Sequence, residues 1–186
     1  MLINITSFIS GPRQIENASA TDSPNVNQLA VSKAVNGYIE YYEPIYLSEM
    51  LGSALADQVT AYAKVEHKPL ATEATDKEEV STDNEEEVDD REPEDPKMES
   101  LIALLKEPLA DYVFFHILRD MNTQATITGL VRLKCANDYV PSLDRGVRIW
   151  NNMVKRNREI QGKIANLGFD VRVDKNMLSS INTFNL

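Results

Sequence analysis

The sequence predicts a mainly α fold: a small helical bundle with a short β-strand or hairpin, a disordered acidic insertion and an extended C-terminal tail. Over most of the chain, apolar residues recur at spacings of three and four, which is typical of one face of an amphipathic helix. Segment 71–97 breaks this pattern because it is rich in acidic residues and almost free of large apolar ones. The last eighteen residues are apolar again but lose the helical period.

Residues 1–70 form the N-terminal helical part of the predicted domain. A first amphipathic helix follows Pro24 and Asn25, which are typical residues for a helix start. Pro44 is expected to interrupt this helix, because proline lacks the amide hydrogen and clashes with the preceding turn. The same residue can open a second helix, in which Gly52 is expected to mark a bend or a close approach of another backbone.

Segment 71–97 is predicted to be a flexible acidic insertion. It holds 13 of the 29 acidic residues and three of the 19 basic ones, which leaves 16 of each elsewhere. The net charge of −10 therefore belongs to this segment, and the rest of the chain is neutral. With so few apolar side chains, the segment cannot bury enough area to offset the entropy of ordering. A solvated spacer is the simplest interpretation, and an electrostatic element that repels DNA or binds a basic partner is the alternative.

Residues 98–168 form the C-terminal helical part of the same domain. Met98–Met121 is apolar nearly all round, which predicts a central helix buried on several sides. A final long helix begins at the capping residue Ser142 and keeps its apolar period as far as Leu167. Gly168 follows as the expected stop residue.

Two short runs separate the central helix from the last one. Thr123–Thr128 is expected to be a polar turn region. Leu130–Cys135 alternates between two sets of side chains with a period of two, which predicts a short strand. A small hairpin, with this strand as one arm, is the alternative.

The C-terminal tail, residues 169–186, is predicted to be extended and to bury its apolar side chains against its own core or a neighbouring copy. We expect it to form an interface with a neighbour, by adding a strand or by lodging side chains there. The candidate interface residues are Phe169, Val171, Val173, Met177, Leu178, Ile181, Phe184 and Leu186.

The sequence shows no pattern of a catalytic, metal or cofactor site, and we therefore expect none and no enzymatic activity. His67 and His116 are far apart in the sequence, with no carboxylate at helical spacing on a face that they share, so they do not resemble a metal site. Cys135 is the single cysteine, which excludes an intrachain disulfide and a cysteine-cluster metal site. Glycine-rich phosphate loops and nucleophile elbows are also missing from the sequence.

Membrane and secretion signals are likewise not recognisable. Residues 1–10 carry no Lys or Arg and lead to no cleavage site typical of a signal peptide. No stretch approaches the roughly 20 apolar residues of a membrane helix. We expect a soluble protein that does not contact membranes.

Four segments resemble a family of small helical head–tail connector (adaptor, or ring) proteins of tailed bacteriophages. They are Gly11-Pro12-Arg13-Gln14-Ile15, Tyr41–Leu55 (YYEPIYLSEMLGSAL), Leu104–Asn137 (LLKEPLADYVFFHILRDMNTQATITGLVRLKCAN) and Arg148–Ile160 (RIWNNMVKRNREI). Together they cover most of the chain outside the acidic insertion, which itself departs from the family's compact pattern.

The resemblance implies a structural protein of the virion, made in the host cytoplasm and located at the head–tail junction. Such proteins assemble with themselves as rings, commonly of twelve copies, beneath the portal protein. They extend the DNA channel and dock other connector or tail proteins, and DNA passes through them without specific binding. A ring requires a heterologous interface, in which different faces of identical subunits meet.

Two other functions remain open from the residues alone. One is an acidic, non-enzymatic regulator that binds a basic or DNA-binding partner, for which the acidic residues would need a fixed arrangement on folded structure. The other is a small hydrolase or nuclease, which would need a rigid carboxylate or histidine constellation.

Overall fold

The computed structural model describes residues 1–65, 67, 94–121, 123–126, 129–132 and 142–182. Most of the acidic insertion, Cys135, Phe184 and Leu186 lie outside these residues. Within them the predicted mainly α fold of a small helical bundle is confirmed. The elements, in chain order, are η1 (Ile5–Phe8), η2 (Gly11–Arg13), α1 (Val26–Leu51), α2 (Ser53–Tyr62), α3 (Pro96–Met121), β1 (Thr123–Thr126), β2 (Gly129–Arg132), α4 (Ser142–Asn166) and η3 (Lys175–Leu178).

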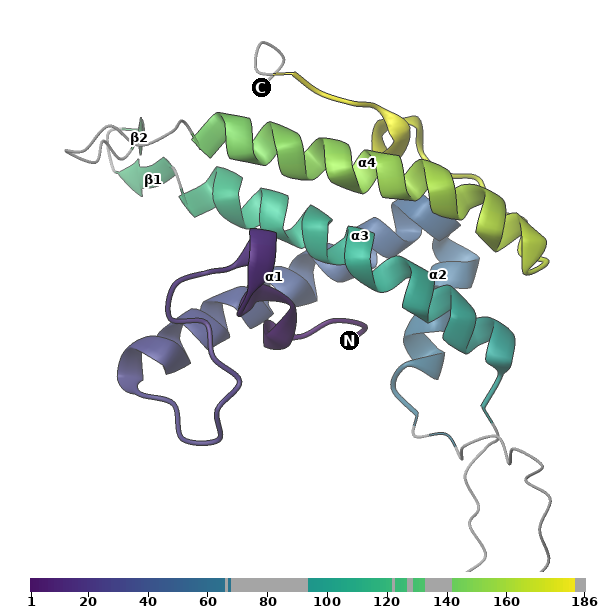
Figure 1. Ribbon diagram of the computed structural model, residues 1–186, viewed down its shortest axis with the longest axis horizontal. Coiled ribbons are helices and arrows are strands. Elements are labelled where there is room, and N and C mark those ends of the chain that lie inside the picture. The colour runs from purple at the N-terminus through teal and green to yellow at the C-terminus, as the bar shows by residue number, and fades with distance from the viewer. Residues whose placement is uncertain (66, 68–93, 122, 127–128, 133–141, 183–186) are drawn as a thin grey trace, which may run out of the picture.

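Helices α3 and α4 lie side by side and run in opposite directions, with β1 and β2 at the end where α3 leads toward α4 (Figure 1). Helix α1 packs on α3, and its second half also reaches α4, where the Tyr46 hydroxyl donates to Asn157 Oδ1 at 2.8 Å. The N-terminal segment crosses α3 (Figure 1). After α4, the chain turns back and runs along the side of α4 that faces away from α3 (Figure 1). Helix α3 is therefore the central layer of the bundle.

The burial of α3 follows from its composition. All residues from Pro108 to Ile117 are buried, including Asp111 and His116. Large side chains from its partners complete the core, among them Phe8, Tyr46 and Met153, each with no exposed surface. The expectation of a central helix buried on several sides is thus confirmed.

The prediction that Pro44 interrupts the first helix is wrong, because α1 continues through Pro44 to Leu51. Pro44 is exposed, as is Glu40, whose carbonyl loses its helical hydrogen-bond donor. Solvent can hydrate that carbonyl, so the helix tolerates the proline there. The start of α1 agrees with the sequence: the Asn25 side chain accepts from Gln28 N, and the Gln28 side chain accepts from Asn25 N, both at 2.9 Å.

The chain bends instead at Gly52, between α1 and α2. Gly52 has φ 77° and ψ 158°, a backbone conformation that is essentially restricted to glycine. A Cβ atom at this position would meet nothing within 4 Å, so the glycine is required by its conformation and not by a close neighbour. The bend predicted at Gly52 is confirmed.

Strand β1 pairs with β2 in antiparallel register, with Thr123 opposite Arg132 and Thr126 opposite Gly129. β1 thus falls within the run Thr123–Thr128, for which a polar turn region was the prediction. Threonine is β-branched and suits a strand as well as a turn, so composition alone did not separate the two.

Helix α4 ends at Asn166, and the predicted stop residue Gly168 follows with φ 91°. The amide of Phe169 donates to the carbonyl of Ile164 at 3.3 Å, and that of Gly168 donates to Ala165 at 3.0 Å. These bonds satisfy two of the last carbonyls of the helix. They also turn the chain back over α4, so the tail begins against that helix.

Candidate functional site

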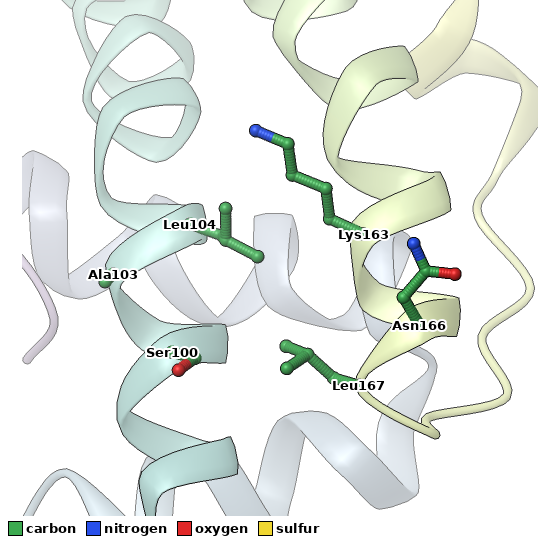
Figure 2. Close-up of a pocket in the computed structure, with 6 residues that line it drawn as sticks. All are labelled: Ser100, Ala103, Leu104, Lys163, Asn166 and Leu167. Atoms are coloured by element: carbon green, nitrogen blue, oxygen red, sulfur yellow. The ribbon is translucent and has the colours of Figure 1, made fainter.

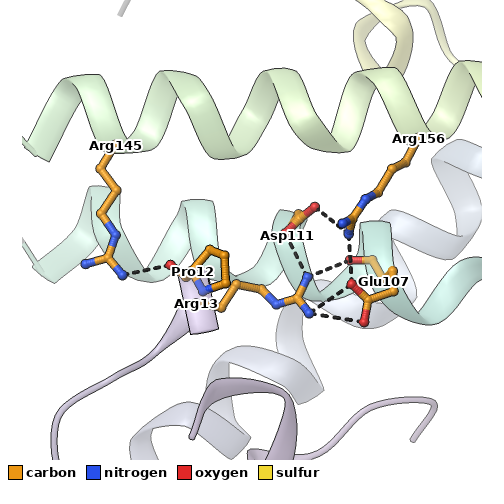
Figure 3. Close-up of polar contacts among 6 residues, drawn as sticks. All are labelled: Pro12, Arg13, Glu107, Asp111, Arg145 and Arg156. Atoms are coloured by element: carbon orange, nitrogen blue, oxygen red, sulfur yellow. Dashed lines mark hydrogen bonds and ion pairs between the residues drawn. The ribbon is translucent and has the colours of Figure 1, made fainter. Parts of the chain in front are cut away.

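The first candidate site is a cluster of charged side chains around Asp111 on α3. The Asp111 carboxylate lies in the core and is 3% exposed. Its Oδ1 accepts from Arg13 Nη1 at 2.8 Å, and its Oδ2 accepts from Arg156 Nη1 at 3.0 Å (Figure 3). Arg13 comes from η2 and Arg156 from α4, so one carboxylate joins three elements.

Glu107, one helical turn before Asp111, forms the open edge of this charged cluster. Its carboxylate accepts from Arg13 Nη2 at 3.0 Å and from Arg156 Nη1 at 2.8 Å (Figure 3). Burial acts to raise the pKa of Glu107, but the two guanidinium groups hold it below its ordinary value. For the more deeply placed Asp111, burial prevails over the same two cations and raises the pKa. Two cations and two carboxylates thus compensate one another.

The chain around Arg13, residues 11–15, is called the N-terminal strap below. The Nη2 of Arg145 on α4 donates to the carbonyl of Pro12 at 2.8 Å (Figure 3), and its guanidinium lies 4.9 Å from the Phe114 ring centroid. The amide of Ile15 donates to the carbonyl of Phe8 at 2.9 Å. The charged cluster and Arg145 therefore hold the strap on the α3–α4 pair.

The second candidate site is the surface of α4 that holds the tail. We call it the tail seat and define it by Trp150, Asn151, Asn157 and Arg158. Trp150 Nε1 donates to the carbonyl of Ser179 at 2.9 Å. The Asn151 side chain donates to the carbonyl of Ile181 and accepts from its amide, both at 2.9 Å. Side chains of α4 thus bind the main chain of the tail.

Asn157 is the buried part of the tail seat and has no exposed surface. Its Nδ2 donates to the carbonyl of Met177 at 2.9 Å, and its Oδ1 accepts from the hydroxyl of Tyr46 on α1 at 2.8 Å. Burial raises the pKa of Tyr46 well above its usual value, so the hydroxyl stays protonated and remains a donor. Arg158 Nε donates to the carbonyl of Leu178 at 3.0 Å.

The tail packs on its own chain over the described residues. Val173 and Met177 are buried in the core, at 8% and 0% exposure. Phe169, Val171, Leu178 and Ile181 are partly buried against it. Phe184 and Leu186, the other two residues predicted for an interface, lie outside the described residues. The structure therefore brings six of the eight predicted residues onto one surface, and that surface belongs to the same subunit.

A shallow groove of about 470 Å³ lies between the first half of α3 and the end of α4. Leu104 and Leu167 face each other across it, and Lys163 stands at the rim (Figure 2). The other lining residues are Ser100, Ala103 and Asn166. The groove is mainly apolar, and it can accept an apolar group.

His116 is buried in an aromatic cluster. Its ring stacks on Tyr42 at 4.0 Å between centroids and meets Tyr112 edge-on at 4.6 Å. Both ring nitrogens lack a hydrogen-bond partner within the described part of the chain. Burial lowers the pKa of His116 to about 4, so the ring is neutral at pH 7.

His67 lies beside Tyr62 at the end of α2, with 3.8 Å between the two ring centroids. Among the described residues, no group of three or more His, Cys, Asp or Glu side chains is placed to hold a metal ion. No helix within the same residues is long and apolar enough to cross a lipid bilayer.

No protein-family model matches this chain, and no curated protein or solved structure matches it significantly.

Sequence reasoning missed both the charged cluster and the tail seat, although two residues carried a signal. Asp111 interrupts the apolar run of α3, and a buried carboxylate needs a cationic partner. Asn157 falls within the apolar stripe of α4, and a buried amide needs hydrogen-bond partners. The identity of those partners depends on contacts between distant segments, which a single sequence does not reveal.

Proposed function

We propose that this protein is a non-enzymatic structural subunit of a bacteriophage head–tail connector. In this proposal it forms a ring below the portal protein, extends the DNA channel without specific DNA binding, and docks other connector or tail proteins at the head–tail junction of the virion. The observation that carries the proposal is the tail seat, because a ring needs a segment of one subunit that can bind the next.

The chemistry of the tail seat suits such a link. Trp150, Asn151 and Asn157 bind carbonyl groups of the tail, which every peptide carries. A surface that binds an extended main chain through side-chain donors accepts the same segment from its own chain or from a neighbour. Exchange of an identical element between subunits costs little, since the contacts that are lost are made again in the assembly.

The resemblance described above supports the choice of a connector among assembly proteins. Its four segments fall on structural parts of the bundle: the N-terminal strap, the α1–α2 bend, the central helix with the hairpin, and α4. The residues of these segments that make identified contacts, such as Arg13 and Trp150, hold chain segments together. That use of polar residues fits a structural component.

The first experiment is to mix the protein with a candidate portal ring and to measure the mass of the complex by light scattering or particle imaging. A defined ring of added subunits is expected. A stable subunit that never associates with portal rings would refute the connector proposal and favour an acidic regulator, for which a basic partner would then be sought.

A cysteine pair tests whether the tail links subunits. The variant carries Asn151→Cys and Ile181→Cys in a Cys135→Ser background, because the Asn151 side chain contacts the Ile181 backbone. If tails are exchanged, oxidised rings give a covalent ladder on a denaturing gel. If only monomers appear from intact rings, the tail remains on its own subunit and the link must lie elsewhere. The matched control pairs Arg148→Cys, exposed on α4, with the same Ile181→Cys.

A further inference from the structure

The outward face of α1 carries large apolar side chains that the subunit does not cover. Val26 is 84% exposed, Leu29 is 60% exposed and Tyr41 is 64% exposed. They lie on the side of α1 opposite the buried stripe that contains Val35, Ile39 and other core residues. We call this surface the α1 outer face and define it by Val26, Leu29, Ala30, Lys33, Ala34, Gly37, Glu40, Tyr41 and Pro44, all exposed.

Charge is sparse and symmetric on this face. Lys33 and Glu40 are its two charged residues, and both are exposed. They are seven positions apart in the sequence, so they share one side of the helix about 10 Å apart. Neither forms an ion pair with any residue that the structure describes. One positive and one negative group thus flank the centre of the face.

Gly37 lies between these two charges. Glycine inside a helix costs about 1 kcal/mol relative to alanine. A Cβ atom at Gly37 would meet nothing within 4 Å, so the packing of the subunit does not require a glycine there. A small residue at this position allows another helix to approach closely, as at other helix crossings built on small residues.

We propose that the α1 outer face binds the same face of a second copy, with the two helices antiparallel about a two-fold axis beside Gly37. The axis falls midway between Lys33 and Glu40, so each lysine meets the glutamate of the other copy and two ion pairs form. The same symmetry brings Leu29 of each copy beside Pro44 of the other. A two-fold contact of this kind is self-complementary and closes at two copies.

This inference does not rest on the connector proposal. The α1 outer face is formed by α1 and the tail seat by α4, and no residue belongs to both surfaces. A ring contact and a two-fold contact can therefore be made or lost independently. Loss of self-association in the test below would leave the portal experiment unaffected, and the reverse also holds.

The test is a charge-reversal series on the full chain, with the dissociation constant measured by sedimentation equilibrium at physiological salt. The natural protein is expected to associate into pairs. Lys33→Glu and Glu40→Lys should each weaken the pair by about tenfold or more, because two attractive contacts become repulsive. The double variant Lys33→Glu/Glu40→Lys should pair as the natural protein does.

Mixing the two single variants gives the sharpest outcome. One copy then presents only carboxylates at the two positions, and the other presents only ammonium groups. Each variant alone should remain monomeric, and the equimolar mixture should form dimers of one copy of each variant. A general effect of net charge cannot produce this result, because the two substitutions change the net charge in opposite directions.

Two further variants separate folding from association. Gly37→Gln should abolish pairing while the far-UV circular dichroism of the dilute protein stays unchanged and its urea unfolding shows no loss of stability, since the site is open within the subunit. Lys155→Glu, exposed on α4, is the matched control and should leave pairing unchanged. A natural protein that stays single up to several hundred micromolar, or a mixture of the single variants that does not pair, would overturn the proposal.

Discussion

The side-chain amide of Asn157 donates a hydrogen bond of 2.9 Å to the backbone carbonyl of Met177, in a space without exposure to solvent. Asn157 accepts a second bond from Tyr46 at 2.8 Å. One amide of α4 therefore connects α1 and the tail within the core. Three segments depend on this residue for buried polar contacts.

Replacement of this amide should be strongly destabilising. Asn157→Leu leaves the Tyr46 hydroxyl and the Met177 carbonyl unpaired in the core, where each unsatisfied group costs on the order of 1–3 kcal/mol. We expect the free energy of unfolding to fall by about 3 kcal/mol, measured by urea denaturation. Asn151→Ala is the matched control: it also loses two bonds to the tail, but the site is half-buried and water can replace them. Equal losses for both variants would contradict the role given to burial.

The pair Arg13 and Asp111 should show strong coupling. Arg13→Met leaves the buried Asp111 carboxylate with Arg156 as its remaining cationic partner, and a loss of roughly 2–3 kcal/mol is expected. Adding Asp111→Leu removes the uncompensated charge and should restore most of that stability. The measurement is a double-mutant cycle by urea unfolding. Strictly additive effects of the two substitutions would show that the carboxylate does not depend on Arg13.

His116 should make the protein less stable in mild acid. Its pKa is lowered to about 4 in the fold by burial, with a smaller contribution from Arg119 that Asp120 opposes. An unfolded histidine has a pKa near 6.5. Between these values the unfolded chain binds a proton that the folded chain does not, so stability falls as the pH drops from about 6.5 to 4.

The size of this effect is about 2–3 kcal/mol over the full window. It should be absent in His116→Phe, which keeps an aromatic ring against Tyr42. The comparison is the difference in unfolding free energy between the two proteins at pH 7 and at pH 4.5. Carboxylates such as Glu43, whose pKa is raised by burial, titrate alike in both proteins, so their contributions cancel in this difference. If the unfolding free energies of the natural protein and of His116→Phe depended on pH in the same way, the role given to His116 would be contradicted.

Substitution of alanine at two of the glycines should change the stability of the protein in opposite directions. Gly52→Ala forces a side chain into a conformation with φ 77°, at an expected cost of about 1–3 kcal/mol. Gly162→Ala, inside α4 where a Cβ meets nothing within 4 Å, should stabilise the protein by about 0.5–1 kcal/mol. Thermal unfolding of the two variants checks both signs. A neutral Gly52→Ala would show that the α1–α2 bend does not need a glycine.

The helices could be predicted from the sequence because their apolar periods are long and regular. The stripe of α4, with Ile160 and Ile164 buried, and its end at Gly168 follow directly from the pattern. The continuation of α1 through Pro44 was not predictable, because the cost of a proline depends on whether the freed carbonyl is exposed. That exposure is set by how α1 lies on α3.

The candidate sites were less predictable than the fold, for a physical reason. Arg13 and Asp111 are 98 residues apart, and Tyr46 and Asn157 are 111 residues apart. Local propensity carries no information about such contacts. The composition of the tail shows that it is apolar and predicts that it forms an interface, but its hydrogen bonds to α4 depend on backbone atoms, which every sequence shares.

The long separation between Arg13 and Asp111 also bears on the order in which the chain folds. Contacts between α3 and α4 close a short loop, whereas the N-terminal strap can dock only after both helices have met. We therefore expect docking of the strap to be a late step, beyond the rate-limiting barrier. Substitutions at Arg13 should accelerate unfolding and leave the refolding rate nearly unchanged. The strap is thus expected to slow the unfolding of a bundle that has already formed.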